Sequence, residues 1–227
     1  MSEALRRYTD LSSVIYTLTN KAVTLINPRS WEDTNDSYYL TLYERAKGFS
    51  TLLALCFTES SERLHYWRVF APGPSGVCIE FDRQALIDHA TEIDGVRSGN
   101  VTYRTLQEMR DSLPTVDELP FVKRYGFEHE SEFRFIYASE TEEKESLDID
   151  IPLSCITKLT FSPWIHPNVY DSVKTTLKDL PSCSRIRIAR STLIGNEEWK
   201  ELGDSAVLEQ KRRSSRVLHR HLINRKQ

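Results

Sequence analysis

The hydrophobic and polar positions of this chain follow two periods, one typical of strands and one typical of helices. Residues 52–58 form an apolar run without a polar face, which is typical of a central strand. Apolar residues at every second position over residues 77–81 predict another strand. Further strands are expected at residues 6–9, 22–26, 100–103, 147–151, 156–161 and 185–189. Helical spacing predicts helices at residues 11–18, 38–48, 65–71, 83–93, 106–113, 169–177 and 206–223.

The order of these elements predicts the fold class. Strands and helices are mixed without a strict strand–helix–strand rhythm, so we expect an α+β fold. The 227 residues are enough for one large domain. We therefore predict a single mixed-sheet domain at residues 1–205 and a basic C-terminal helix at residues 206–227.

The stretch FEHESEFRFIY, residues 127–137, combines charged and aromatic positions in alternation. We predict one strand here, with Glu130, Glu132 and Arg134 in a row on one face. Carboxylates and a guanidinium in line are costly to bury unless they pair or bind something. Two interpretations follow, a charged row that lines a cleft and a surface strand with a cross-paired arginine.

Charge is distributed unevenly along the chain. The formal net charge is -3, but residues 211–227 contain seven Lys or Arg and no acid. A basic tail on an acidic body indicates contact with nucleic acid or an acidic protein partner. The alternative is a terminal helix that packs its apolar stripe on the body and leaves its charges in water. The nucleic-acid-binding candidates are Lys211, Arg212, Arg213, Arg216 and Arg220.

Several classes of protein are disfavoured by the sequence. The four cysteines show no C-x-x-C spacing, so we expect them to be reduced and buried. No apolar run is long enough for a membrane span, and the N-terminus lacks the apolar core of a signal peptide. We therefore expect a cytoplasmic protein without membrane contact. The histidines form no metal-binding pattern, so no metal is expected.

Arginine and aromatic residues elsewhere in the chain suggest what a cleft could bind. Arg7 and Tyr8 lie in the first predicted strand, and Trp31 lies in a polar loop at residues 30–36. Arginine can bind a phosphate with two hydrogen bonds, and aromatic rings can stack on a flat ligand. A carboxylate can stabilise a positive charge that develops during a reaction. These residue types suit a ligand with phosphates, a ring and an electron-poor centre.

Ordered segments of the chain resemble a known family. The segments are LRRYT (5–9), LTNKAVTLINPRSWEDTND (18–36), ALCFTE (54–59), YWRVFAPGPSGVCIEFD (66–82) and FEHESEFRF (127–135), with a weaker continuation in ITKLTFSP (156–163). Their order and spacing resemble the bacterial family known as domain of unknown function 2971. That family usually has Trp at the position of Phe127 and an Asn-Asp-Pro loop where this chain has Asn35, Asp36 and Ser37.

The pattern is also similar to the ADP-ribosyltransferase superfamily, in which residues of three strands surround NAD. This resemblance implies a split sheet, with NAD as the substrate. Arg7 matches the first-strand position and would hold a phosphate of NAD. Glu130 and Glu132 match the E-x-E of the arginine-first class. Glu132 would bind the ribose and stabilise positive charge as nicotinamide leaves, and Glu130 would orient or deprotonate the acceptor. The further cofactor-binding candidates are Tyr8, Ser30, Trp31, Trp67 and Arg134.

Three functions are left open by the sequence. The first is an ADP-ribosyltransferase-like enzyme that modifies a macromolecule and acts as a toxin or anti-phage defence effector. The second is a non-catalytic module that binds a nucleotide or nucleic acid. The third is a metal-dependent nuclease that uses Glu80, Asp82, Glu130 and Glu132, because hard cations prefer carboxylate oxygens. A homo-oligomer or an inhibitory partner is a further expectation.

Overall fold

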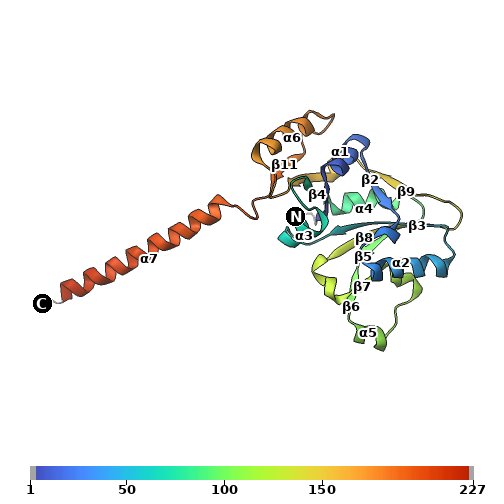
Figure 1. Cartoon of the computed structure of the whole chain (residues 1–227), viewed down its shortest axis with the longest axis horizontal. Coiled ribbons are helices and arrows are strands. Elements are labelled where there is room, and N and C mark those ends of the chain that lie inside the picture. The colour runs from blue at the N-terminus through green and yellow to red at the C-terminus, as the bar shows by residue number, and fades with distance from the viewer. Residues whose placement is uncertain (1–3, 225–227) are drawn as a thin grey trace. The chain divides into compact units, whose positions relative to one another are not determined.

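The fold is built from eleven strands, seven α-helices and four short 3-10 helices among the described residues (Figure 1). The computed structural model describes the backbone of residues 4–224 and the side chains of residues 4–29 and 31–212. The strands are β1 (Ala4–Asp10), β2 (Ala22–Ile26), β3 (Thr51–Thr58), β4 (Gly76–Asp82), β5 (Val96–Asn100), β6 (Thr102–Arg104), β7 (Val122–Arg124), β8 (Glu132–Ser139), β9 (Ser146–Asp150), β10 (Ile156–Phe161) and β11 (Arg187–Arg190). The α-helices are α1 (Leu11–Asn20), α2 (Thr34–Lys47), α3 (Leu64–Phe70), α4 (Arg83–Thr91), α5 (Leu106–Asp111), α6 (Pro167–Asp179) and α7 (Glu197–Asn224). The 3-10 helices are η1 (Pro28–Ser30), η2 (Val116–Phe121), η3 (Tyr125–Glu130) and η4 (Leu153–Cys155).

Nine of the strands form one sheet that divides at β3. One edge of β3 pairs with β8 along its whole length, with Thr58 opposite Glu132. The other edge is shared, because β1 pairs with it at Thr58 and β2 pairs with it at Ala54. From there the sheet continues in two branches, β1-β4-β10-β11 and β2-β9. Since β10 and β11 are parallel and the other pairs of this nine-stranded sheet are antiparallel, the predicted α+β fold with a large mixed sheet is confirmed.

The hydrophobic core lies on both faces of this sheet. Alternation along β8 directs Phe133 and Phe135 to the face on which α1 and α4 pack. Leu40 and Tyr43 of α2 pack on the opposite face, against residues such as Ile136. Six apolar residues of the strands predicted at 52–58, 77–81 and 127–137 are all at most 2% exposed, namely Leu53, Leu55, Ile79, Phe81, Phe133 and Phe135. These buried strands make a rigid frame for the loops between them.

The predicted strand over residues 127–137 is partly wrong. Residues Tyr125–Glu130 form the 3-10 helix η3, and the strand begins only at Glu132. Ser131 between them has a φ of 43°, a left-handed conformation that interrupts an extended chain. Glu132 and Arg134 therefore share a strand face as predicted, whereas Glu130 reaches the same region from a different element.

The polar loop predicted at residues 30–36 is shorter than expected. Helix α2 already begins at Thr34, and Asp33 caps it. The Asp33 carboxylate accepts hydrogen bonds from the backbone N–H groups of Asn35 (3.0 Å) and Asp36 (3.3 Å). The cap fixes the start of α2, so that Trp31 precedes the helix and Asp36 lies in its first turn.

The four cysteines are free thiols. Cys78, Cys155 and Cys183 are buried as predicted, whereas Cys56 is partly exposed. The exposure of Cys56 follows from its position on β3, beside the place where the sheet divides.

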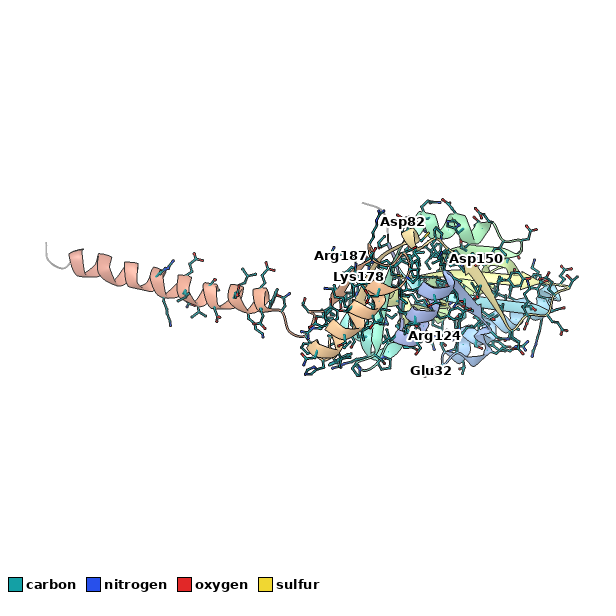
Figure 2. All side chains as sticks on the ribbon, turned by 90° about the horizontal axis from the view of Figure 1, so that it is seen from above. Glu32, Asp82, Arg124, Asp150, Lys178 and Arg187 are labelled. Carbon is teal, nitrogen blue, oxygen red and sulfur yellow. The ribbon has the colours of Figure 1, made fainter. Side chains whose placement is uncertain are left out.

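The chain separates into two compact units, Met1–Arg190 and Ser191–Gln227. Helix α7 in the second unit starts nine residues before the predicted basic helix at 206–223, and the predicted domain division at residue 206 stays a prediction. Side chains of α7 up to Arg212, including Lys211, are exposed, and sticks project from both sides of the helix in Figure 2. The predicted nucleic-acid contacts Arg213, Arg216 and Arg220 lie outside the described side chains. Of the helices in the described part of the chain, none has the length and apolar character needed to cross a membrane.

Candidate active site

A cavity of about 510 Å³ lies where the sheet divides. Strands β1 and β2 separate along one edge of β3. Between Ala54 and Thr58 this edge has no strand partner among the described residues. Cys56, Phe57 and Thr58 come from this interval and line the cavity. The volume is within the usual range for small-molecule sites. The split of the sheet therefore creates the space that a ligand can enter.

Arg7 of β1 brings a positive charge to this cavity. Its guanidinium has no hydrogen-bond or ion-pair partner among the described residues, whereas the neighbouring Arg6 binds Glu80 at 2.8 Å. Burial lowers the pKa of Arg7, and nearby Cys56 and Asp10 partly offset that effect. An arginine remains charged even so, and a partly desolvated cation without a counter-ion favours an anionic ligand.

Glu130 and Glu132 line another wall of the cavity, and Lys123 of β7 connects them. The Lys123 Nζ lies 2.6 Å from Glu130 Oε2 and 3.2 Å from Glu132 Oε2. It also lies 3.6 Å from Asp36 Oδ2. Three carboxylates from α2, η3 and β8 are thus held together by one ammonium group.

Arg134 holds the same cluster from the buried side. Its two terminal nitrogens donate to the two carboxylate oxygens of Asp36, at 2.9 and 2.7 Å. Its Nε donates to Glu132 Oε1 at 2.7 Å, and Nη1 also donates to the Pro120 carbonyl at 2.8 Å. Nη2 also lies 2.6 Å from Glu132 Oε1, so the guanidinium makes four hydrogen bonds and one further close ion-pair contact. Arg134 therefore fixes the orientation of the Glu132 carboxylate.

The charges of the cluster set the protonation of its acids. Burial by itself raises the pKa of Glu132, but Arg134 and Lys123 outweigh it, and the pKa lies below its ordinary value. Burial raises the pKa of Glu130, and the Lys123 ammonium offsets this only in part. Glu132 is thus held ionised, while Glu130 is the stronger base of the two. This combination suits one fixed negative charge and one proton acceptor.

Aromatic rings complete the walls. Trp31, Phe70 and Phe127 line the cavity. The Trp31 ring lies over the Arg134 guanidinium, with the ring centroid 5.1 Å from Cζ, and the Phe127 ring lies 4.9 Å from Lys123 Nζ. The cations fix these rings in place, so the cavity offers flat apolar surfaces next to its charges.

Part of this chain is similar to a known protein family. Residues 66–135 match the model of a family described as a protein of unknown function, DUF2971. The chain resembles this family, as the sequence predicts. No curated protein sequence matches the chain.

Solved structures of DarT from Thermus sp. 2.9 show a distant likeness. The complexes with carba-NAD+ and with NAD+ each have a TM-score of 0.42 and 12% sequence identity, covering 84% of this chain and 96% of that chain. The complex with ADP-ribosylated single-stranded DNA has a TM-score of 0.43 and 10% identity, covering 84% of this chain and 94% of that chain.

The structure brings five of the predicted site residues to one cavity, namely Arg7, Tyr8, Trp31, Glu130 and Glu132. The side chain of the candidate Ser30 lies outside the described residues.

Two predicted ligand contacts are corrected, because Trp67 and Arg134 are fully buried and do not line the cavity. Trp67 donates from Nε1 to Glu62 at 2.8 Å and packs edge-on against Tyr8, with ring centroids 5.0 Å apart. Both residues therefore support cavity walls from behind.

Sequence reasoning missed Asp36 and Lys123 as parts of the carboxylate cluster. Asp36 lies in the polar loop predicted at residues 30–36, next to the candidate Trp31, so its residue type and position gave a signal. Lys123 lies outside every element and motif that the sequence predicts, and nothing in the local pattern marks it. Its role depends on the parallel pairing of β6 with β7, which carries Lys123 to the cluster.

The four carboxylates of the proposed metal-dependent nuclease do not meet. Glu80 binds Arg6, and Asp82, labelled in Figure 2, caps α4 by accepting from the backbone N–H of Ala85 at 3.0 Å. Neither lines the cavity with Glu130 and Glu132. Among the residues described by the structure, no group of three or more His, Cys, Asp or Glu could hold a metal ion.

Proposed function

We propose that this protein is an ADP-ribosyltransferase-like enzyme that uses NAD to modify a macromolecule. One observation carries the proposal, namely that the uncompensated guanidinium of Arg7 and the ionised carboxylate of Glu132 face the same cavity at the division of the sheet. NAD combines a diphosphate with a cationic nicotinamide ring on a ribose, so it matches both charges at once.

Each wall of the cavity has a role in this proposal. Arg7 binds a phosphate oxygen of NAD through charge-assisted hydrogen bonds. Trp31 and Phe127 contact the flat nicotinamide or the ribose next to it. Glu132, held by Arg134, accepts a hydrogen bond from a ribose hydroxyl. The surrounding cations keep Glu132 ionised, so its charge is available when positive charge develops on the ribose.

The reaction cleaves the bond between C1′ of the ribose and N1 of nicotinamide. The electron pair of that bond goes to the nicotinamide, which leaves as a neutral molecule. Positive charge then develops on C1′ and the ring oxygen, and Glu132 stabilises it. An acceptor atom forms the new bond to C1′ and gives its proton to Glu130, whose pKa burial raises.

Calorimetry with NAD and mass spectrometry of reaction products test the proposal. We expect saturable NAD binding and a mass increase of one ADP-ribosyl group on a cellular macromolecule. Binding without nicotinamide release or transfer would support a non-catalytic nucleotide-binding module instead. Absence of NAD binding would contradict the proposal altogether.

We also propose a physiological role for the enzyme and a nucleic-acid partner. The enzyme acts as a toxin or an anti-phage effector, so its expression in bacterial cells should arrest growth and Glu132→Gln should relieve the arrest. The basic end of the chain contacts nucleic acid, a proposal supported by the seven positive charges and the lack of acids over residues 211–227. Lys211 and Arg212 are exposed and accessible for such contact.

A further inference from the structure

The Glu130 carboxylate already forms an ion pair with a cation of the protein itself. Its Oε2 lies 2.6 Å from the Lys123 Nζ, and the two side chains are only 12% and 9% exposed. The ammonium contacts Glu132 and Asp36 as well. A charge held by three carboxylates in a nearly dry place is costly to displace.

Two cations of the protein itself already neutralise most of the carboxylate charge beside the cavity. Asp36, Glu130 and Glu132 supply three negative charges, and Lys123 and Arg134 supply two positive charges within bonding distance. Arg134 pairs with Asp36 and Glu132, and Lys123 lies closest to Glu130, at 2.6 Å. A carboxylate that binds a guanidinium or ammonium acceptor needs a negative charge free of such a pair, and the charge of Glu130 is already paired with Lys123.

We propose that Lys123 determines acceptor specificity by occupying the cation position on Glu130, so that the enzyme modifies an uncharged acceptor and excludes guanidinium and ammonium acceptors. This inference rests on the proposed NAD-dependent transfer. Lys123 acts here as a positioning residue, because it acts on the acceptor through Glu130.

An uncharged acceptor fits the chemistry of the cluster. A hydroxyl, amide or ring N–H approaches Glu130 as a hydrogen-bond donor without displacing Lys123. As the bond from the acceptor atom to C1′ forms, its proton passes to the Glu130 carboxylate. Lys123 remains charged throughout and keeps Glu130 in place. A guanidinium would instead bring a second cation within reach of Lys123, and like charges at this distance repel.

Removal of Lys123 should open the site to cationic acceptors. We would measure calorimetric binding of agmatine, a small guanidinium compound, to the wild-type chain, Lys123→Ala and Lys123→Arg. Lys123→Ala should bind agmatine roughly 10- to 100-fold more tightly than the wild type, as one charge-assisted hydrogen bond is regained. Lys123→Arg keeps the positive charge and should bind agmatine as weakly as the wild type does.

The matched control is Lys144→Ala. Lys144 also pairs with a glutamate, Glu142 at 2.5 Å, but both side chains are more than a third exposed. Its removal should create no measurable agmatine site, because exposed ion pairs are weak. If Lys123→Ala does not fold by circular dichroism, Lys123→Met keeps the apolar stem without the charge and replaces it in every measurement.

The second part of the test measures transfer of ADP-ribose to agmatine. With NAD present, mass spectrometry should detect ADP-ribosylated agmatine with Lys123→Ala and none with the wild type. Equal binding of agmatine by the folded variant and the wild type, or transfer to agmatine by the wild type, would overturn the inference. Binding of agmatine is measured without NAD, so it decides the role of Lys123 even where NAD turnover itself fails.

Discussion

Arg134 and Asp36 form an ion pair with two parallel hydrogen bonds, 2.9 and 2.7 Å long, between side chains that are 98 positions apart in the sequence. Both side chains are buried, at 0% and 1% exposure. The pair ties helix α2 to strand β8 behind the cavity. It also leaves the Nε of Arg134 directed at Glu132, so the orientation of the carboxylate depends on a residue that no ligand touches.

Asp36→Asn should destabilise the protein by about 3–5 kcal/mol, because it leaves the buried Arg134 charge without its main partner. Urea denaturation followed by circular dichroism measures the change. Asp117→Asn is the matched control, since Asp117 pairs with Lys47 at 2.8 Å but its side chain is 60% exposed. A cost as small as that of the control would mean that the buried pair is not formed.

Stability at high pH should depend on Lys123. Burial alone would lower the pKa of Lys123, but Glu132, Glu130 and Asp36 outweigh it and the pKa is raised. The folded protein therefore keeps this proton after the unfolded chain has lost it. The stabilisation from Lys123 is full below the unfolded pKa of about 10.4 and is lost as pH rises further.

This pH dependence is measured as the difference in unfolding free energy between the wild type and Lys123→Met. We expect a constant difference from pH 7 to about 9.5 and a decline above about 10.4. Lys123→Arg should show no such decline relative to Lys123→Met, because arginine stays protonated in this range. A difference that grows with pH would contradict the assignment of the charged contacts.

Arg7→Gln should weaken NAD binding by roughly 10- to 100-fold, the effect of losing hydrogen bonds from a charged donor. Calorimetry measures it, and the unfolding free energy should change little because Arg7 has no partner among the described residues. Arg68→Gln is the control on an exposed arginine of α3 that does not line the cavity. Equal NAD affinity for Arg7→Gln and Arg68→Gln would remove Arg7 from the site.

Much of the frame could be predicted from the sequence because strand periodicity fixes the direction of side chains. Alternation placed Phe133 and Phe135 in the core and set Glu132 on the opposite face with Arg134. The strand that contains Arg7 was predicted at residues 6–9 and is present as β1. These strand placements are confirmed because each depends mainly on the local sequence of its own strand.

The rest of the site depends on contacts between distant segments. The left-handed conformation of Ser131 separates Glu130 from the strand that begins at Glu132. A serine gives no strong sequence signal for this conformation. Lys123 reaches its carboxylates through the pairing of two short strands, a tertiary event without a local motif. The burial of Trp67 depends on packing against Tyr8, so a tryptophan expected at a ligand lies behind the wall.

Residues 211–227 should account for nucleic-acid binding. Full-length protein and a chain ending at Gln210 would be titrated with RNA and DNA across a salt series. Binding by the full chain should weaken with salt by a log–log slope of about −0.9 per neutralised phosphate, and the shorter chain should lose most of the affinity. Equal and salt-insensitive affinity of the two chains would remove the basic tail as a nucleic-acid contact. Aggregation of the shorter chain would instead indicate a helix that covers apolar surface.

The most direct test of the account is nicotinamide release from NAD by the wild type and by Glu132→Gln. The glutamine keeps the shape of the side chain but removes the charge that stabilises the ribose cation, so the rate should fall roughly 100- to 1000-fold. Glu128→Gln, an exposed change on η3 outside the cavity, should release nicotinamide at the wild-type rate. Folded Glu132→Gln protein that releases nicotinamide as fast as the wild type would contradict the assignment of Glu132 and of the cavity as the site of NAD cleavage.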